Sequence, residues 1–159
     1  MVRTSSQQAS ATRPPTVPQF VNELVKFILR SPLHRLLSKN RMLLTFTGRK
    51  SGKHYTIPLS YVQEGETILC ITGNTSWWRN LRGGVPVKVM LKGQERGGMA
   101  QAIFDDPAVI MQGLQKLLQA IPSDAKYHEV KLDFKGQPNV EDMAQAANSS
   151  ILIHIQLTY

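Results

Sequence analysis

The chain has 159 residues, of which 42% are hydrophobic, so it can bury one sizeable core and we expect a single domain. Its formal net charge of +8 lies in the first third: residues 1–53 hold ten Lys or Arg against one acid, which leaves nine basic and ten acidic residues in 54–159. This asymmetry indicates an anionic ligand, membrane surface or polyanion near that segment, but the absence of any nucleic-acid-binding module signature argues against nucleic acid.

The small number of cysteine and histidine residues argues against disulfide-linked and metal-binding classes of protein. Cys70 is the single cysteine, so no disulfide forms within the chain and a reducing, cytoplasmic setting fits. Within the apolar run 67–72 a small buried hydrophobe is the simpler interpretation of this thiol. The four histidines have no ligand spacing, so we expect no metal site. No signal peptide or membrane span is evident.

The N-terminal segment has two parts. Residues 1–18 are polar and rich in proline, which predicts a flexible tail, and the domain is expected to cover 19–159. Apolar residues at helical spacing then predict helices over Gln19–Arg30 and Leu33–Lys39. Packing on a sheet is the favoured role of this basic amphipathic pair, while peripheral contact with an anionic membrane through Phe20–Lys39 stays open.

A basic turn, Thr47–Lys53, separates two predicted strands, Arg41–Thr47 and Tyr55–Gln63. Gly48 and Gly52 can adopt positive φ, so the turn is expected to curl and present its N–H groups outward. Three cations surround these donors and the Ser51 hydroxyl is a further partner, which suits a phosphate; the cations are Arg49, Lys50 and Lys53. The simpler alternative is a solvated hairpin tip. Pro58 places the second strand at an edge or a bulge.

A second informative stretch follows the third predicted strand, Thr67–Gly73. Asn74, Thr75 or Ser76 can cap a short helix whose N-terminus attracts an anion or a polar ring edge. Trp77 and Trp78 are neighbours in sequence, so their rings diverge on a helix. We therefore expect one ring in the core and the other on a pocket.

The rest of the chain predicts more strands and two helices. Strands are expected over Pro86–Lys92 and Met99–Phe104, joined by a turn at 93–98, then over Glu129–Phe134 and Ile151–Tyr159; helices are expected from Asp106-Pro107 to Pro122 and over Asn139–Ala147. Successive hairpins imply an antiparallel meander, typical of a small barrel. The fold class is therefore α+β, predominantly antiparallel β, with helices at one side.

Three stretches in this order resemble one protein family. The turn Thr47–Gly52, the strand Thr56–Tyr61 (TIPLSY) and the helix Trp77–Leu81 (WWRNL) are similar to those of the deazaflavin-dependent nitroreductase family. This family belongs to the flavin and deazaflavin oxidoreductases with a split β-barrel (FMN-binding-like). The resemblance implies coenzyme F420, or alternatively FMN, and hydride transfer to an organic acceptor such as a quinone, nitroaromatic or unsaturated compound.

The resemblance also implies a cofactor site. The phosphate and acidic tail of the cofactor would lie against Arg49, Lys50, Ser51 and Lys53. The ring of the cofactor would lie along Thr56, Ile57 and Pro58. The other side would be closed by Thr72, Gly73, Asn74, Ser76, Trp77 and Asn80, with Tyr127 as a candidate for the substrate pocket. Tyr55 stands where many members carry Arg, and the basic residue that many members have at the strand end near Gly73 and Asn74 is absent. The cationic ring is therefore weaker than in those members.

Other functions stay open at this stage. No catalytic side chains are evident, so the chemistry of an enzyme would be carried by the cofactor. A non-catalytic carrier of a deazaflavin, haem-like or fatty-acyl ligand is the alternative function. Both a monomer and a homodimer are compatible with the sequence.

Overall fold

The computed structural model describes residues 39–158. The predicted tail 1–18 and the predicted helices at 19–30 and 33–39 therefore lie outside the described residues, apart from Lys39. The elements along the described chain are β1 (Arg41–Thr47), β2 (His54–Ser60), β3 (Val62–Glu64), β4 (Thr67–Gly73), η1 (Trp77–Leu81), β5 (Val85–Leu91), β6 (Gln94–Ile103), α3 (Pro107–Ala120), η2 (Pro122–His128), α4 (Val140–Ser149) and β7 (Ser150–Leu157).

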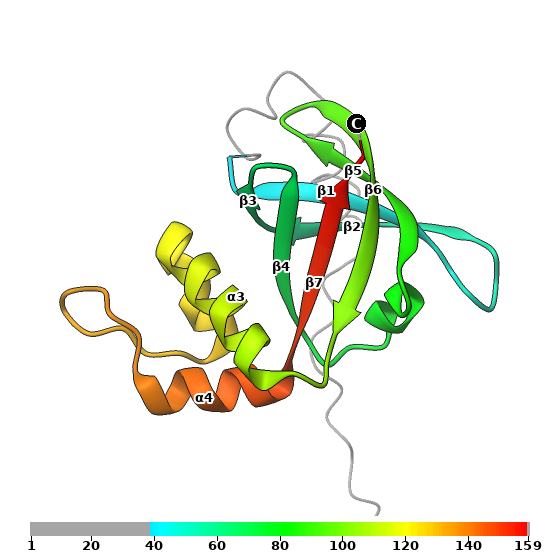
Figure 1. Ribbon diagram of the computed structural model, residues 1–159. Helices are drawn as coiled ribbons and strands as arrows, with labels where there is room; N and C mark the ends of the chain where they lie inside the picture. Colours follow the sequence, from blue (N-terminus) through cyan, green and yellow to red (C-terminus); the bar gives the residue numbers. More distant parts are fainter. Residues whose placement is uncertain (1–38, 159) are drawn as a thin grey trace, which may run out of the picture.

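All strands belong to one antiparallel sheet with the order β2-β1-β5-β6-β7-β4-β3 (Figure 1). The chain passes from β2 to β3 through the single residue Tyr61, so one continuous segment forms both edges of the sheet. This continuity curls the sheet into a barrel, which stays open where β2 and β4 run without pairing. The predicted antiparallel split β-barrel is confirmed.

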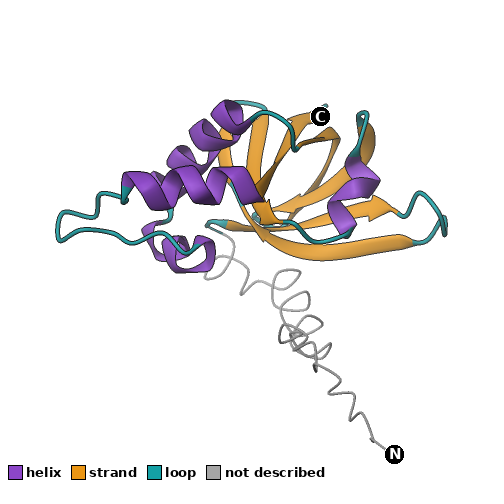
Figure 2. Ribbon diagram, turned by 90° about the horizontal axis from the view of Figure 1, so that it is seen from below, coloured by secondary structure: helices purple, strands orange, loops and turns teal. Residues whose placement is uncertain are grey.

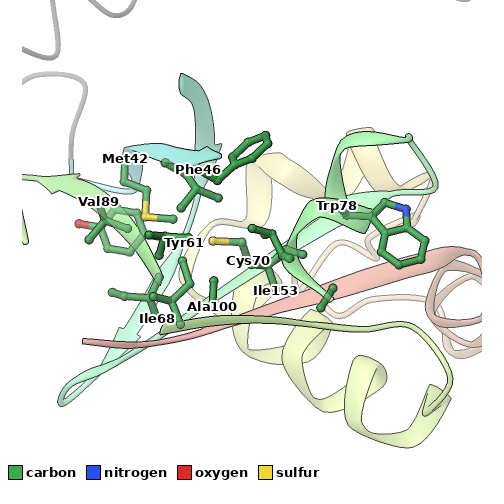
Figure 3. Close-up of a cluster of buried hydrophobic side chains, with 14 of the residues drawn as sticks. Met42, Phe46, Tyr61, Ile68, Cys70, Trp78, Val89, Ala100 and Ile153 are labelled. Carbon is green, nitrogen blue, oxygen red and sulfur yellow. The ribbon is translucent and has the colours of Figure 1, made fainter. Parts of the chain in front are cut away.

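The curled sheet separates two hydrophobic cores. One fills the barrel, where Met42, Cys70 and Ile153 meet around Tyr61 (Figure 3). The other lies between the outer face of the sheet and the helices, with Leu114 and Leu117 of α3 at its centre. Both helices cover the same side of the barrel, as expected (Figure 2). β7 contributes to both cores because it runs through the middle of the sheet.

The second predicted strand, 55–63, is in fact two strands. The break falls at Tyr61, whose side chain is buried in the barrel and whose N–H donates to the Asn40 carbonyl over 3.1 Å. Pro58 does not interrupt β2, where it is paired with Leu43. An edge strand tolerates proline because one side of it needs no hydrogen-bond donor, so the predicted edge position is confirmed.

Two other sequence predictions were wrong. The turn predicted over 93–98 is confined to Lys92 and Gly93, because positive φ at both residues (49° and 82°) closes a tight hairpin, and β6 begins at Gln94. The strand predicted over 129–134 is a single bridge between Leu132 and Pro138, preceded by the unexpected 3-10 helix η2. Val130 and Leu132 of this segment instead pack into the core beneath α3 and α4, whereas Phe134 is exposed.

Both predicted helix starts are confirmed. The Asp106 carboxylate accepts from the Val109 N–H, with proline at the first helical position of α3. The Asn139 side chain accepts from the Asp142 N–H at the start of α4. Within residues 39–158, no helix has the length and apolar character needed to span a membrane.

Candidate functional site

Two pockets open along the edge strand β2, one toward each end. The first, here called the turn cleft, lies between the basic turn and η1. Figure 1 shows that the hairpin tip of β1 and β2 and the short helix η1 lie on the side of the barrel away from α3 and α4. The turn cleft has a volume of about 570 Å3 and is lined by Phe46, Gly48, Arg49, Lys50, Ser51, Tyr55, Ile57, Ser76, Trp77, Arg79 and Asn80. Seven of the predicted site residues therefore share one cleft.

The basic turn is folded more tightly than its sequence alone indicates. The Gly48 N–H donates to the Lys53 carbonyl over 2.8 Å, and the Gly52 N–H donates to the Gly48 carbonyl over 2.9 Å. Gly52 has the expected positive φ of 68°, but Gly48 does not. A Cβ at Gly48 would lie 2.7 Å from the Ser51 hydroxyl and 2.8 Å from the Tyr55 ring, so glycine is required there for space.

Most N–H groups of the turn point inward, contrary to the expectation. The Arg49 N–H donates to Asn80 Oδ1 over 3.0 Å and the Lys53 N–H donates to Ser51 Oγ over 3.2 Å. Together with Gly48 and Gly52, four of the six N–H groups in 48–53 are used inside the described part of the chain. The N–H groups of Lys50 and Ser51 have no partner among residues 39–158 and are left for a ligand.

Asn80 joins the two walls of the turn cleft. Its Oδ1 receives the Arg49 N–H, and its Nδ2 donates to the Trp77 carbonyl over 2.8 Å. Both ends of the amide are therefore occupied by the protein. Asn80 lines the cleft as predicted, but it fixes the distance between the turn and η1 instead of offering its amide to a ligand.

The floor of the turn cleft is aromatic. Phe46 stacks on Tyr55 with ring centroids 5.8 Å apart and on Trp77 with centroids 5.7 Å apart. Trp78, by contrast, is buried in the barrel and its indole N–H donates to Asn74 Oδ1 over 3.3 Å. The expected division of the tryptophan pair, one ring in the core and one on a pocket, is confirmed.

Three cations surround this floor. Arg49 and Lys50 come from the turn, and Arg79 comes from η1 on the opposite wall. The Arg79 guanidinium lies over the Trp78 ring, 5.0 Å from its centroid, which restrains the side chain. Lys53 is exposed and does not line the cleft. An anion of two or more charges would meet cations from both walls.

The predicted cap of the tryptophan helix was wrong. η1 is a five-residue 3-10 helix, and Ser76 at its N-cap position makes no side-chain cap bond. Asn74 is engaged with Trp78 and lines neither pocket. The expectation failed in part because the Asn74 side chain accepts from the Trp78 indole and not from the N–H groups of η1.

The second pocket, here called the split pocket, lies where β2 and β4 separate. It has a volume of about 370 Å3 and is walled by β2, by the end of β4 and by η2. Four predicted residues line it, namely Pro58, Thr72, Gly73 and Tyr127. Four ionisable residues that were not predicted also line it, and these are Arg41, Asp124, His128 and Glu129.

The ionisable groups of the split pocket are close to one another. Arg41 Nη2 lies 3.5 Å from Asp124 Oδ1, and Asp124 is buried. Burial lowers the pKa of His128 below the usual 6.5, and the Asp124 carboxylate offsets part of this change. His128 therefore favours its neutral form in the folded protein.

Three predicted residues, Lys53, Asn74 and Thr56, line neither of the two pockets. Thr56 bonds to Thr45 across the β1–β2 pair, with the two hydroxyl oxygens 2.9 Å apart. Successive residues of a strand alternate in direction, so Ile57 lines the turn cleft while Thr56 points to the outer face. The prediction of Thr56 as a contact of the ring was thus not supported by its orientation.

The functional residues that were not predicted differ in whether the sequence contained a signal for them. Arg79 stands inside the quoted WWRNL stretch, and a third cation next to an aromatic pair was a usable signal. No feature of the sequence pointed to Asp124, because its burial depends on the packing of η2 against β1 and α3.

Neither a metal site nor a reactive thiol is found in the described chain. Among residues 39–158, no group of three or more His, Cys, Asp or Glu side chains could hold a metal ion. Cys70 is fully buried in the barrel, and burial raises the pKa of its thiol well above the usual range. Its expected role as a small buried hydrophobe is confirmed.

Comparison with known proteins gives an independent line of evidence on the family of this chain. A family model described as F420H2-dependent quinone reductase matches residues 30–130. No curated protein is similar enough to match the chain. One similar solved structure, described as a domain-swapped dimer, is 18% identical, with 87% of this chain and 98% of that chain covered and a TM-score of 0.53.

Two further solved structures have the same fold. An F420-H2 dependent reductase (FDR-A) is 19% identical, with 73% of this chain and 94% of that chain covered and a TM-score of 0.50. A FAD-binding protein from Mesorhizobium loti is 10% identical, with 79% and 85% covered and a TM-score of 0.51. At these identities the likeness concerns the split-barrel fold alone.

Proposed function

Because the chain belongs to the F420H2-dependent quinone reductase family, we propose that it transfers a hydride between coenzyme F420 and an organic acceptor such as a quinone, nitroaromatic or unsaturated compound. The protein is an oxidoreductase of the deazaflavin-dependent class. The choice of acceptor and the assignment of residues to cofactor and acceptor are the parts proposed here.

The observation that carries the proposal is the composition of the turn cleft. Arg49, Lys50 and Arg79 supply three cations, and the N–H groups of Lys50 and Ser51 are left for a ligand. Coenzyme F420 carries a phosphate and an acidic tail, so this donor set fits its anionic part. Lys53, which lies outside the cleft, is not needed for this assignment.

β2 connects the anion site to the split pocket. Ile57 and Leu59 lie on the same face of β2, and Ile57 lines the turn cleft while Leu59 lines the split pocket. A ligand with an anionic end and a flat ring can therefore extend along this edge. We place the ring beside Pro58, Thr72 and Gly73, where its polar edge can meet backbone groups.

The chain's own residues bind and orient, and the bound cofactor supplies the hydride chemistry. Asn80 holds the turn at a fixed distance from η1, so the cations are in place before the ligand arrives. The remaining part of the split pocket, beside Tyr127, is then open to the acceptor. Tyr127 is two-thirds exposed, so its ring can cover an acceptor without loss of core packing.

Titration of the purified protein with coenzyme F420, and separately with FMN, tests this proposal. The change in cofactor fluorescence is followed at moderate salt, because exposed cations are screened at high salt. Micromolar or tighter binding of coenzyme F420, followed by oxidation of its reduced form on addition of a quinone, is the expected outcome. Binding without any turnover would instead support a non-catalytic carrier, and binding of FMN alone would replace the cofactor.

A further inference from the structure

Asp124 is an unusual residue for the wall of a small pocket. It lies in η2, is 3% exposed and lines the split pocket. Its Oδ1 is buried and has no hydrogen-bond partner among residues 39–158. Arg41 Nη2 lies 3.5 Å from this oxygen and makes an ion pair without a hydrogen bond.

Such a carboxylate is costly for folding. Buried oxygens of a carboxylate normally accept hydrogen bonds, and leaving one unsatisfied carries its full desolvation penalty. The ion pair compensates only part of this penalty, because the Arg41 side chain is 45% exposed and solvated. The group is therefore poorly explained as a structural element.

The surroundings define what Asp124 Oδ1 would accept. Arg41 faces the Asp124 carboxylate, and the second carboxylate of the pocket belongs to Glu129, an exposed residue whose charge is solvated. A neutral ligand that donates one hydrogen bond therefore fits the buried Asp124 better than a second cation. Ile71 and Leu59 make part of the wall apolar, so the part of the pocket beside η2 that the cofactor ring leaves open suits a small cyclic molecule.

We infer that Asp124 determines specificity for the electron acceptor, and that the split pocket selects neutral cyclic acceptors that carry an O–H or N–H donor beside the reducible group. The donor meets the Asp124 carboxylate, which Arg41 Nη2 faces from 3.5 Å. The description of this ligand as the acceptor rests on the proposed function. The hydrogen bond itself does not, since it forms on binding alone.

A pair of probes that differ by one hydroxyl tests the inference. The affinities of 2-(hydroxymethyl)-1,4-naphthoquinone and 2-methyl-1,4-naphthoquinone for the cofactor-free protein are compared by calorimetry. The hydroxymethyl compound is expected to bind about tenfold tighter or more, as for a hydrogen bond to a charged group. The buried Cys70 thiol is the only one in the chain, so quinone adducts do not interfere.

Two substitutions at the same position sharpen the test. In Asp124→Leu the preference is expected to disappear, whereas Asp124→Asn keeps an oxygen that can accept and should retain a smaller preference. Asp105→Asn makes the same chemical change at an exposed acid outside both pockets, and it should leave the preference at its wild-type value.

Stability separates this role from a structural one. Asp124→Leu is expected to be at least as stable to urea as the wild-type protein, because the half-exposed Arg41 remains solvated when its partner is removed. A protein that loses much of its stability or fails to fold would show that Asp124 is structural and would overturn the inference.

Other outcomes are also decisive. Equal affinities in the wild-type protein, a preference that persists in Asp124→Leu, or no binding of either probe would each overturn the inference. None of these results depends on coenzyme F420. A failure of the cofactor titration would therefore overturn the proposed function while leaving the hydrogen bond to be judged by the probe pair.

Discussion

Lys50 and Lys53 are cations of the same turn, but only Lys50 lines the turn cleft. If the cleft holds the anionic part of coenzyme F420, Lys50→Ala should weaken binding by about 1.5–3 kcal/mol, typical of a hydrogen bond to a charged group. Lys53→Ala removes the same charge outside the cleft and should change the affinity much less. Fluorescence titration of both variants measures the difference, and equal effects would favour a diffuse electrostatic attraction over a built site.

His128 predicts a dependence of stability on pH. Burial lowers its pKa below the usual 6.5, so the unfolded chain binds a proton more readily than the folded one. The free energy of unfolding should therefore decrease as the pH falls through 6.5 toward the lower pKa of the folded state. Urea unfolding at pH 7.5 and pH 5 measures this loss, which should be smaller in His128→Gln. An unchanged loss in that variant would assign the pH dependence to other groups.

The residue scale also shows where sequence interpretation stops. Gly52 was predicted from backbone freedom and has positive φ, whereas Gly48 is required by its closeness to Ser51 and Tyr55. The charges of Arg49 and Lys50 were visible as a local cluster. The burial of Asp124 was not, because it arises from elements distant in sequence that pack together.

At the scale of elements, β6 approaches β7 closely because Gly98 has no side chain. A Cβ at Gly98 would lie 2.9 Å from Ile155 Cγ2 and 3.0 Å from the Gln156 carbonyl oxygen. Gly98→Ala should therefore lower the free energy of unfolding by about 1–3 kcal/mol, as overpacking does. Gly73→Ala is the matched control, since its Cβ would meet nothing within 4 Å. Urea unfolding of both variants tests this, and equal stabilities would mean that β7 shifts at little cost.

Strands and helices were predictable where local chemistry decides them. β1 and β4 were predicted with their correct limits, and the caps of α3 and α4 were visible as Asp106 and Asn139. The failures share a cause. The break at Tyr61 and the loop at 129–134 follow from packing in the barrel and under the helices. The local periodicity of apolar residues does not reveal such packing between distant segments.

At the scale of the whole molecule, the two pockets share no lining residue, although both border β2. Substitutions in one pocket should therefore act independently of those in the other. Arg79→Ala should raise the Kd of coenzyme F420 with little effect on the probe preference, and Asp124→Leu should do the reverse. In the double variant the two changes in free energy should add within about 0.5 kcal/mol. A larger deviation, measured in both titrations, would mean that β2 transmits strain between the pockets.

The split of the barrel was predictable only through the family resemblance. Successive predicted hairpins indicate antiparallel pairing. They do not indicate which strands at the edges of the sheet stay unpaired. The gap between β2 and β4 arises because Tyr61 redirects one segment from the first edge to the last. That gap is also where the missed residues Arg41, Asp124 and His128 gather.

The central position of β7 has a consequence for how the protein folds. β7 joins β6 to β4, and its residue Gln156 pairs with Thr67, 89 residues earlier in the chain. Until that long loop closes, the β3–β4 hairpin has no partner in the rest of the sheet. Such a topology has a high contact order, and the entropy lost on closure comes before most of the packing is gained. The barrel should therefore fold slowly, with the edges of β4 and β6 open to wrong pairing until β7 arrives.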